Sequence, residues 1–152
     1  MSLEHDLAFF ERVPTFSVLG KQALRILAIG AETRRLQNGA VLFYSGDLAD
    51  GGYVVQEGLL LLEPNSPRES EPFTAGPGTL VGELALLTDT VRASTAIAKG
   101  PTVVIRISRS LFRKMLEGYP AAAQNLRDMV AERVDGWTRE LGGVKQALNK
   151  RE

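Results

Sequence analysis

The sequence contains no cysteine and a single histidine among its 152 residues, and each scarcity removes a class of chemistry. Without cysteine, disulfides, thiolate catalysis and cysteine-ligated metal sites are excluded. The one histidine, His5, cannot supply a Ser-His-Asp or Cys-His arrangement or the several imidazoles of a metal site. We therefore predict a protein that is not an enzyme and that holds no metal or cofactor.

Net charge and long apolar stretches are also missing. The 18 basic and 18 acidic residues cancel, so the chain has no overall positive field to attract nucleic acid. The longest apolar runs, such as residues 59–62, are far shorter than the roughly 20 residues that span a membrane. Acidic Glu4 and Asp6 stand where a secretory signal would carry Lys or Arg. We expect one cytoplasmic domain without membrane association or specific nucleic-acid binding.

The chain's hydrophobic residues, 44% of the total, are arranged in three blocks. In residues 1–38, apolar side chains recur at helical spacing from Leu24 through Leu36, which predicts helix up to a turn at Asn38-Gly39. In residues 39–108, short apolar runs alternate with glycine-rich turns, and this favours a sandwich, barrel or roll over parallel βαβ units. Gly46 and Asp47 form one such predicted hairpin turn.

The third block, residues 109–152, is predicted to be helical. Ser108 and Ser110 are candidate N-caps at its start. Its later apolar residues are spaced alternately by four and three: Val130, Val134, Trp137, Leu141, Val144 and Leu148. This heptad-like pattern predicts a homodimer through residues 130–148.

The chemistry-bearing residues lie between Gly78 and Thr95. Gly82 precedes a short apolar run that reads as one helical turn, and the unpaired amides at a helix start suit an anion. Arg92 follows Glu83 by nine positions and can return to the same place. The arginine fork can bind a phosphate bidentately, while the carboxylate can accept from a sugar hydroxyl. We predict that these two side chains converge on a ribose phosphate.

These residues resemble the phosphate-binding cassette of the cyclic nucleotide-binding domain family. The family's Phe-Gly-Glu-Leu-Ala and Arg-Ala-Ala/Ser-Thr blocks correspond to residues 81–86 and 92–95. A second block, which ends in Gly-Asp and an aromatic-Val-Ile-x-x-Gly strand, corresponds to residues 39–58. The similarity extends from about Phe9 to Met129.

The resemblance implies a mainly β fold with flanking helices, an eight-stranded β-roll of the jelly-roll type. All three blocks then form one domain, with the cassette at residues 78–95 and a cyclic purine nucleotide inside the roll. Glu83 would accept from the ribose 2′-hydroxyl, and Arg92 would pair with the exocyclic phosphate oxygens. The implied ligand-binding set is Gly82, Glu83, Leu84, Ala85, Arg92, Ala93 and Ser94.

Base preference and the lid follow from the same resemblance. In cGMP-selective members, a Thr or Ser directly after the arginine can bond the guanine amino group. Here that residue is Ala93, which favours cAMP over cGMP, and Ser94 is expected to point the other way in an extended strand. A lid residue from the C-terminal helix would contact the base. Trp137 is a candidate, although a tryptophan on a heptad pattern is more often an interface or core residue.

Three interpretations remain open. The first is a regulatory module that binds a cyclic nucleotide and moves its C-terminal helix. The second is the sensor half of a transcription regulator of the cyclic-AMP receptor type. Too few residues follow Arg139 for a helix-turn-helix unit, so specific DNA binding by this chain alone is not expected. The third is a degenerate roll that binds another small ligand or none, in which Glu83 and Arg92 form a structural salt bridge.

Overall fold

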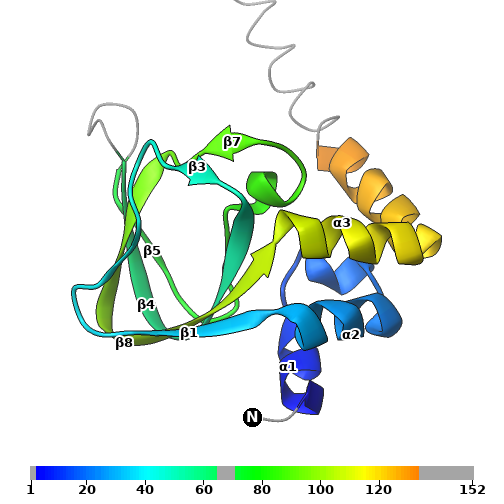
Figure 1. Ribbon diagram of the computed structural model, residues 1–152, viewed down its shortest axis with the longest axis horizontal. Helices are drawn as coiled ribbons and strands as arrows, with labels where there is room; N and C mark the ends of the chain where they lie inside the picture. Colours follow the sequence, from blue (N-terminus) through cyan, green and yellow to red (C-terminus); the bar gives the residue numbers. More distant parts are fainter. Residues whose placement is uncertain (1–2, 65–70, 134–152) are drawn as a thin grey trace, which may run out of the picture.

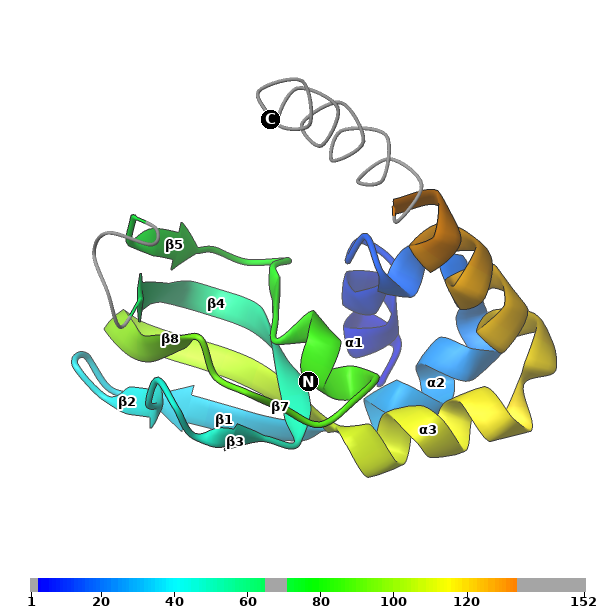
Figure 2. The same cartoon turned by 90° about the horizontal axis from the view of Figure 1, so that it is seen from above.

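The computed structural model describes residues 3–64 and 71–133, in which a β-roll lies beside a group of helices (Figures 1 and 2). Residues 120–133 are helical and complete this group. Among the described residues, no helix is both long and apolar enough to cross a bilayer. The other elements, in chain order, are α1 (Leu3–Phe10), η1 (Phe16–Val18), α2 (Lys21–Gly30), β1 (Glu32–Leu36), β2 (Val41–Phe43), β3 (Leu48–Ala49), β4 (Gly51–Pro64), β5 (Phe73–Ala75), β6 (Leu80–Val81), η2 (Glu83–Leu86), β7 (Thr90–Val91), β8 (Ser94–Ser108) and α3 (Arg109–Gly118).

The roll is built on one long antiparallel ladder between β4 and β8. The pairing runs from Gly51 with Ser108 to Pro64 with Ser94. Strands β1 and β2 pair with β8, β5 and β6 pair with β4, and β3 and β7 form a separate two-stranded sheet. The described residues thus hold eight strands, and the predicted β-roll with flanking helices is confirmed.

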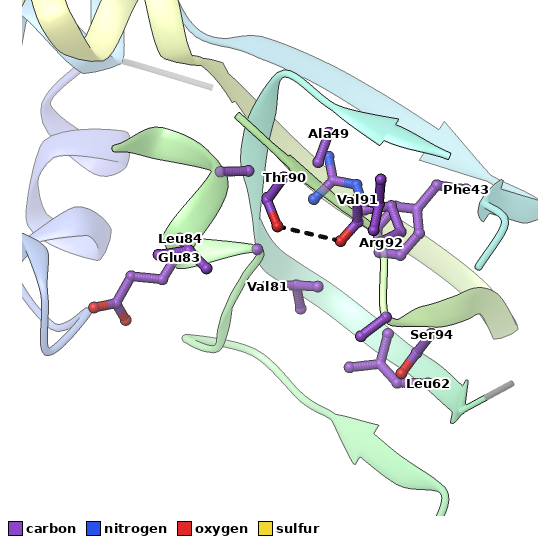
Figure 3. A pocket seen from close by; sticks show the side chains of 13 residues that line it. Phe43, Ala49, Leu62, Val81, Glu83, Leu84, Thr90, Val91, Arg92 and Ser94 are labelled. Atoms are coloured by element: carbon purple, nitrogen blue, oxygen red, sulfur yellow. Dashed lines mark hydrogen bonds between the residues drawn. The ribbon is translucent and has the colours of Figure 1, made fainter. Parts of the chain in front are cut away.

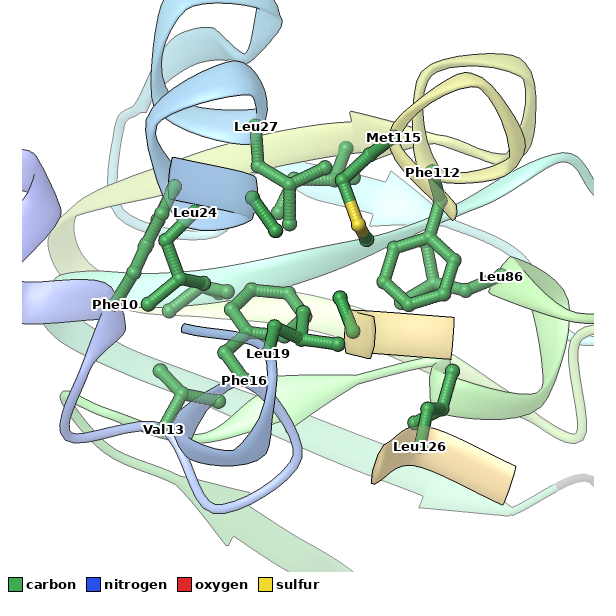
Figure 4. Close-up of a cluster of buried hydrophobic side chains, with 14 of the residues drawn as sticks. Phe10, Val13, Phe16, Leu19, Leu24, Leu27, Leu86, Phe112, Met115 and Leu126 are labelled. Atoms are coloured by element: carbon green, nitrogen blue, oxygen red, sulfur yellow. The ribbon is translucent and has the colours of Figure 1, made fainter. Parts of the chain in front are cut away.

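Two apolar cores hold the domain together. The first lies within the roll and comprises Phe43, Tyr53, Val55, Leu60, Ala75, Val81, Ala96 and Val104. The second joins the helices to the end of the roll (Figure 4). In this second core Leu86 of η2 lies with Phe112 of α3 and Leu126 of the last helix, all nearly or fully buried. Because η2 adjoins the candidate site, this core connects the site to the helices.

The predicted helix through Leu36 is wrong. Helix α2 ends at Gly30, and residues 32–36 form β1, which pairs with β8 from Glu32 opposite Arg106 to Leu36 opposite Thr102. The first four residues of this strand are exposed, so no apolar alternation marks it in the sequence. Pairing with the partner strand, rather than local pattern, determines its conformation.

Other local predictions are confirmed. The side chain of Ser108, and not that of Ser110, caps α3 by accepting from the amide of Leu111 at 3.1 Å. Gly46 has a φ of 92°, and the Asp47 carboxylate accepts from the amide of Tyr44 at 2.9 Å, as the predicted turn requires. The predicted dimer segment beyond Arg133 and the candidate lid Trp137 lie outside the described residues.

Candidate functional site: a cavity around a buried arginine

A cavity of about 320 Å³ opens into the roll beside η2. Figure 3 shows it between η2, the β7 segment and the roll strands. All seven residues of the predicted ligand-binding set line this cavity, and the other lining residues are Phe43, Ala49, Leu62, Val81, Thr90 and Val91. The structure therefore brings the two halves of the predicted cassette to one place.

Arg92 is the buried charge of this cavity, with only 7% of its surface exposed. Its Nη2 donates to the carbonyl of Gly51 at 2.8 Å, and its guanidinium carbon lies 4.4 Å from the ring centre of Phe43 and 5.5 Å from that of Tyr53. Among the described residues, no carboxylate lies within ion-pair distance of it.

Burial lowers the pKa of Arg92, but a guanidinium stays protonated because its ordinary pKa is so high. Asp50, one of the acids whose charge acts on Arg92, instead binds Arg106 at 2.9 Å. Within the described part of the chain, the positive charge in the cavity therefore has nearby acids but no carboxylate in direct contact with it.

Gly82 makes this arrangement possible. Its φ of 81° lies in the left-handed region, where L side chains are strained. A Cβ atom at this position would also collide with Nη1 of Arg92. The guanidinium thus packs directly against the backbone at the start of η2, and only glycine permits this contact.

Glu83 and Arg92 line the same cavity, but their side chains do not meet in this structure, and their convergence on a ribose phosphate stays a prediction. The Glu83 carboxylate accepts from Nη1 of Arg133, in the helix of residues 120–133, at 2.6 Å. In Figure 3 it extends away from Arg92. A structural Glu83–Arg92 salt bridge, as in the degenerate-roll interpretation, is likewise not formed. Arg133 is a counter-ion that lies 50 residues away in the sequence, so local spacing could not reveal it.

The remaining members of the predicted set differ in their surroundings. Leu84 is exposed, whereas Ala85 is buried and its amide already donates to the Gly82 carbonyl at 3.1 Å. That amide is therefore engaged within η2 and is not one of the unpaired donors expected there. Ala93 lines the cavity as expected, and Ser94 lines it as well, although we expected it to point the other way.

Sequence reasoning missed three kinds of contact around the cavity. The rings of Phe43 and Tyr53 stack with the Arg92 guanidinium, and these contacts were not predicted from the sequence. Arg133 was not connected with Glu83. Arg109 was not singled out, although its side chain donates to the carbonyls of two cavity-lining residues, Ala85 and Ala49. Such long-range contacts leave no periodic signal.

Comparison with known proteins defines the class. Residues 33–119 match the family model described as "Cyclic nucleotide-binding domain", and the chain belongs to this family. It is 28% identical over 123 residues to the Cyclic AMP receptor protein of Thermus thermophilus, with 80% of this chain and 57% of that protein covered. It is 30% identical over 101 residues to a cAMP-dependent protein kinase regulatory subunit of Yarrowia lipolytica, with 66% of this chain and 26% of that protein covered.

A solved structure agrees with these relatives. The N-terminal domain of a transcriptional regulator from Streptomyces coelicolor A3(2) superposes with a TM-score of 0.79 at 27% identity, covering 88% of this chain and 94% of that one. By contrast, the chain spans little more than half of the Thermus protein and about a quarter of the Yarrowia protein. The likeness is therefore to one domain of these longer proteins.

Proposed function

We propose that this domain is a non-catalytic regulatory module that binds a cyclic purine nucleotide, cAMP in preference to cGMP, and transmits binding through its C-terminal helical segment. The observation that carries the proposal is Arg92, a buried cation without a carboxylate partner among the described residues. A buried charge is costly unless an opposite charge accompanies it. The single negative charge of a cyclic phosphodiester would supply the missing partner.

The cavity suits the rest of such a ligand. Its volume of about 320 Å³ falls in the range of small-molecule sites. Phe43, Leu62 and Val81 give it apolar walls against which a purine can pack. Two relatives carry cAMP in their names, a Cyclic AMP receptor protein and a cAMP-dependent kinase regulatory subunit, and both support cAMP as the ligand. The preference over cGMP rests on Ala93, which has no hydroxyl to offer a guanine amino group.

Transmission would begin at Glu83. Its carboxylate is bonded to Arg133 and points away from Arg92, so in this proposal it leaves Arg133 to accept from the ribose 2′-hydroxyl, and the ligand and the last helix compete for one group. Leu86 of the same turn packs with Phe112 and Leu126, which adds an apolar connection to the helices. A ligand shifts a conformational equilibrium only through contacts that differ between the states, and these two contacts can differ. Trp137 remains the proposed lid.

Titration calorimetry with cAMP, cGMP and AMP on the whole chain tests the proposed ligand. We expect cAMP to bind most tightly and cGMP at least about tenfold more weakly, which corresponds to about 1.4 kcal/mol. AMP is the matched control, because it carries the same base and sugar with an open, more highly charged phosphate. Absence of binding to either cyclic nucleotide contradicts the proposal, as does AMP binding as tightly as cAMP.

Removing the competing cation tests the transmission step. In Arg133→Met, we expect the affinity for cAMP to rise by about 1.5- to fivefold, because an exposed ion pair is worth about 0.2–1 kcal/mol. The pair is indeed exposed, with 44% of the Arg133 side chain and 35% of the Glu83 side chain accessible. Arg127→Met is the control, since Arg127 lies on the same helix and hydrogen-bonds to Gln124. A lower affinity in Arg133→Met alone would show that Arg133 stabilises the bound state instead.

A second candidate function is the sensor part of a longer transcription regulator. It is favoured by the superposition on the N-terminal domain of the Streptomyces regulator and by the partial coverage of the Thermus protein. In this proposal, the homodimer predicted through residues 130–148 would bring two sensors together. The ligand chemistry of the cavity is the same in both candidates.

A further inference from the structure

Arg109 of α3 bonds to three residues around the cavity, Ala49, Ala85 and Asp89, without lining the cavity itself. We propose that Arg109 is a positioning residue for the nucleotide-binding segment, residues 82–92. Its role rests on the proposed function, since it sets the geometry of the same site.

The contacts of Arg109 reach two positions within that segment, Ala85 and Asp89. Its Nε donates to the carbonyl of Ala85 in η2 at 2.8 Å, and its Nη1 binds the carboxylate of Asp89 at 2.6 Å. Its Nη2 donates to the carbonyl of Ala49 at the end of β3. Ala49 and Ala85 line the cavity, and Asp89 precedes the lining residue Thr90. Arg109 therefore holds backbone and side-chain groups of the cavity wall in place, although it does not itself line the cavity.

The segment depends on such contacts because its own secondary structure is slight. It consists of a four-residue 3-10 turn, a short loop and the two-residue strand β7. A 3-10 turn has weaker hydrogen bonds than an α-helix, and so short a strand contributes little cross-strand pairing. Tertiary bonds must therefore fix the position of the backbone that faces the ligand.

Arg109 is itself firmly anchored. It is the first residue of α3, its amide donates to the carbonyl of Asp50 at 2.8 Å, and the neighbouring Ser108 caps the helix. Only 13% of its side chain is exposed. The rigid guanidinium fork can hold three acceptors in fixed directions, which a lysine ammonium on a flexible stem cannot. Loss of Arg109 would leave the ligand to order the segment on binding, and affinity would fall accordingly.

The test compares Arg109→Met and Arg109→Lys with wild type and with Arg106→Lys. Arg106 is the matched control, because its side chain is 16% exposed and pairs with Asp50 and Glu32 instead of the segment. In the ligand-free protein, we expect amide hydrogen exchange over residues 82–92 to accelerate roughly tenfold or more in both Arg109 variants, with residues 103–107 of β8 unchanged. The affinity for cAMP should fall by about ten- to a hundredfold in Arg109→Met and by less in Arg109→Lys.

Several outcomes overturn the inference. Unchanged exchange over residues 82–92 does so, as does faster exchange combined with wild-type affinity for cAMP. Full recovery by lysine would show that charge alone matters, which also contradicts a positioning role. If Arg109→Met does not fold, the exchange rates and the cAMP affinity of Arg109→Lys decide whether Arg109 has a positioning role. If the wild type binds no cyclic nucleotide, the proposed function fails, whereas the exchange comparison still decides whether Arg109 fixes the segment.

Discussion

Replacing Arg92 by methionine is expected to abolish cAMP binding while leaving the ligand-free domain at least as stable as wild type. Loss of a charged group that pairs with a ligand costs about 2–5 kcal/mol, or roughly 30- to several thousand-fold in affinity. Glu83→Ala should lose less, because the Glu83 carboxylate is partly exposed and already paired with Arg133. The same calorimetric titrations measure both variants.

The expected stability of Arg92→Met follows from the cost of burying the arginine charge when no ligand is bound. Burying an ion costs several kcal/mol, and the lowered pKa of Arg92 reflects this burial. Against it stand one hydrogen bond from a charged donor, about 1.5–3 kcal/mol, and the ring contacts, about 0.5–2 kcal/mol. Methionine removes the buried charge and keeps an unbranched apolar stem beside Phe43. Urea unfolding without ligand should therefore give a free energy of unfolding no lower than that of wild type.

Arg34→Met is the control for this variant. Arg34 lies on β1, its guanidinium carbon is 5.9 Å from the ring centre of Tyr53, and 44% of its side chain is accessible. It should keep wild-type affinity, since Arg34 does not line the cavity. If Arg92→Met retains cAMP affinity within about threefold, a difference below about 0.7 kcal/mol, Arg92 is not the phosphate-binding group.

Gly82→Ala is expected to reduce both the stability of the domain and its affinity for cAMP, because it changes the backbone that packs against Arg92. A left-handed conformation costs an L residue about 1–2 kcal/mol, so the free energy of unfolding should fall by about that amount. The added methyl group also meets Nη1 of Arg92 and must displace the guanidinium. Affinity for cAMP should then fall by about 30-fold or more, as it would if the arginine contact were lost. Urea unfolding and calorimetry measure the two effects separately.

Gly39→Ala is the control that separates the effect of backbone strain from the effect of displacing the Arg92 guanidinium. Gly39 has a similar φ of 83°, and an added Cβ would meet nothing within 4 Å. This control should lose a similar free energy of unfolding and still bind cAMP normally. Equal affinity losses in the two variants would mean that general destabilisation, not movement of Arg92, reduces binding.

The fold and the two segments that line the cavity were predictable from the sequence, because their signals are local. The Gly-Glu-Leu-Ala and Arg-Ala-Ser-Thr blocks lie within a short stretch, and the cap at Ser108 and the turn at Gly46 follow from individual residue chemistry. The edge strand β1 was not predicted, because its mostly exposed residues show no alternation of apolar and polar side chains that would mark a strand. Its pairing with β8 joins residues some 66 to 74 positions apart, as in Leu36 with Thr102 and Glu32 with Arg106.

The orientation of side chains at the site was less predictable than their position. Sequence spacing indicates that Glu83 and Arg92 return to one cavity, but a side chain turns towards its best available partner. For Glu83 that partner is Arg133, and for Arg92 it is the Gly51 carbonyl together with two aromatic rings. Both partners come from distant parts of the chain. Arg92 is thus held inside the cavity, while the Glu83 carboxylate is turned towards the last helix.

The ladder between β4 and β8 affects how this protein folds during its synthesis on the ribosome. Paired residues are separated by 30 positions at one end, Pro64 with Ser94, and by 57 at the other, Gly51 with Ser108. Strand β4, with the apolar run from Leu59 to Leu62, therefore emerges well before its partner and presents an unprotected edge. Such non-local pairing slows folding. Shielding of the nascent strand by a chaperone would matter most in the interval before Ser108 has left the exit tunnel.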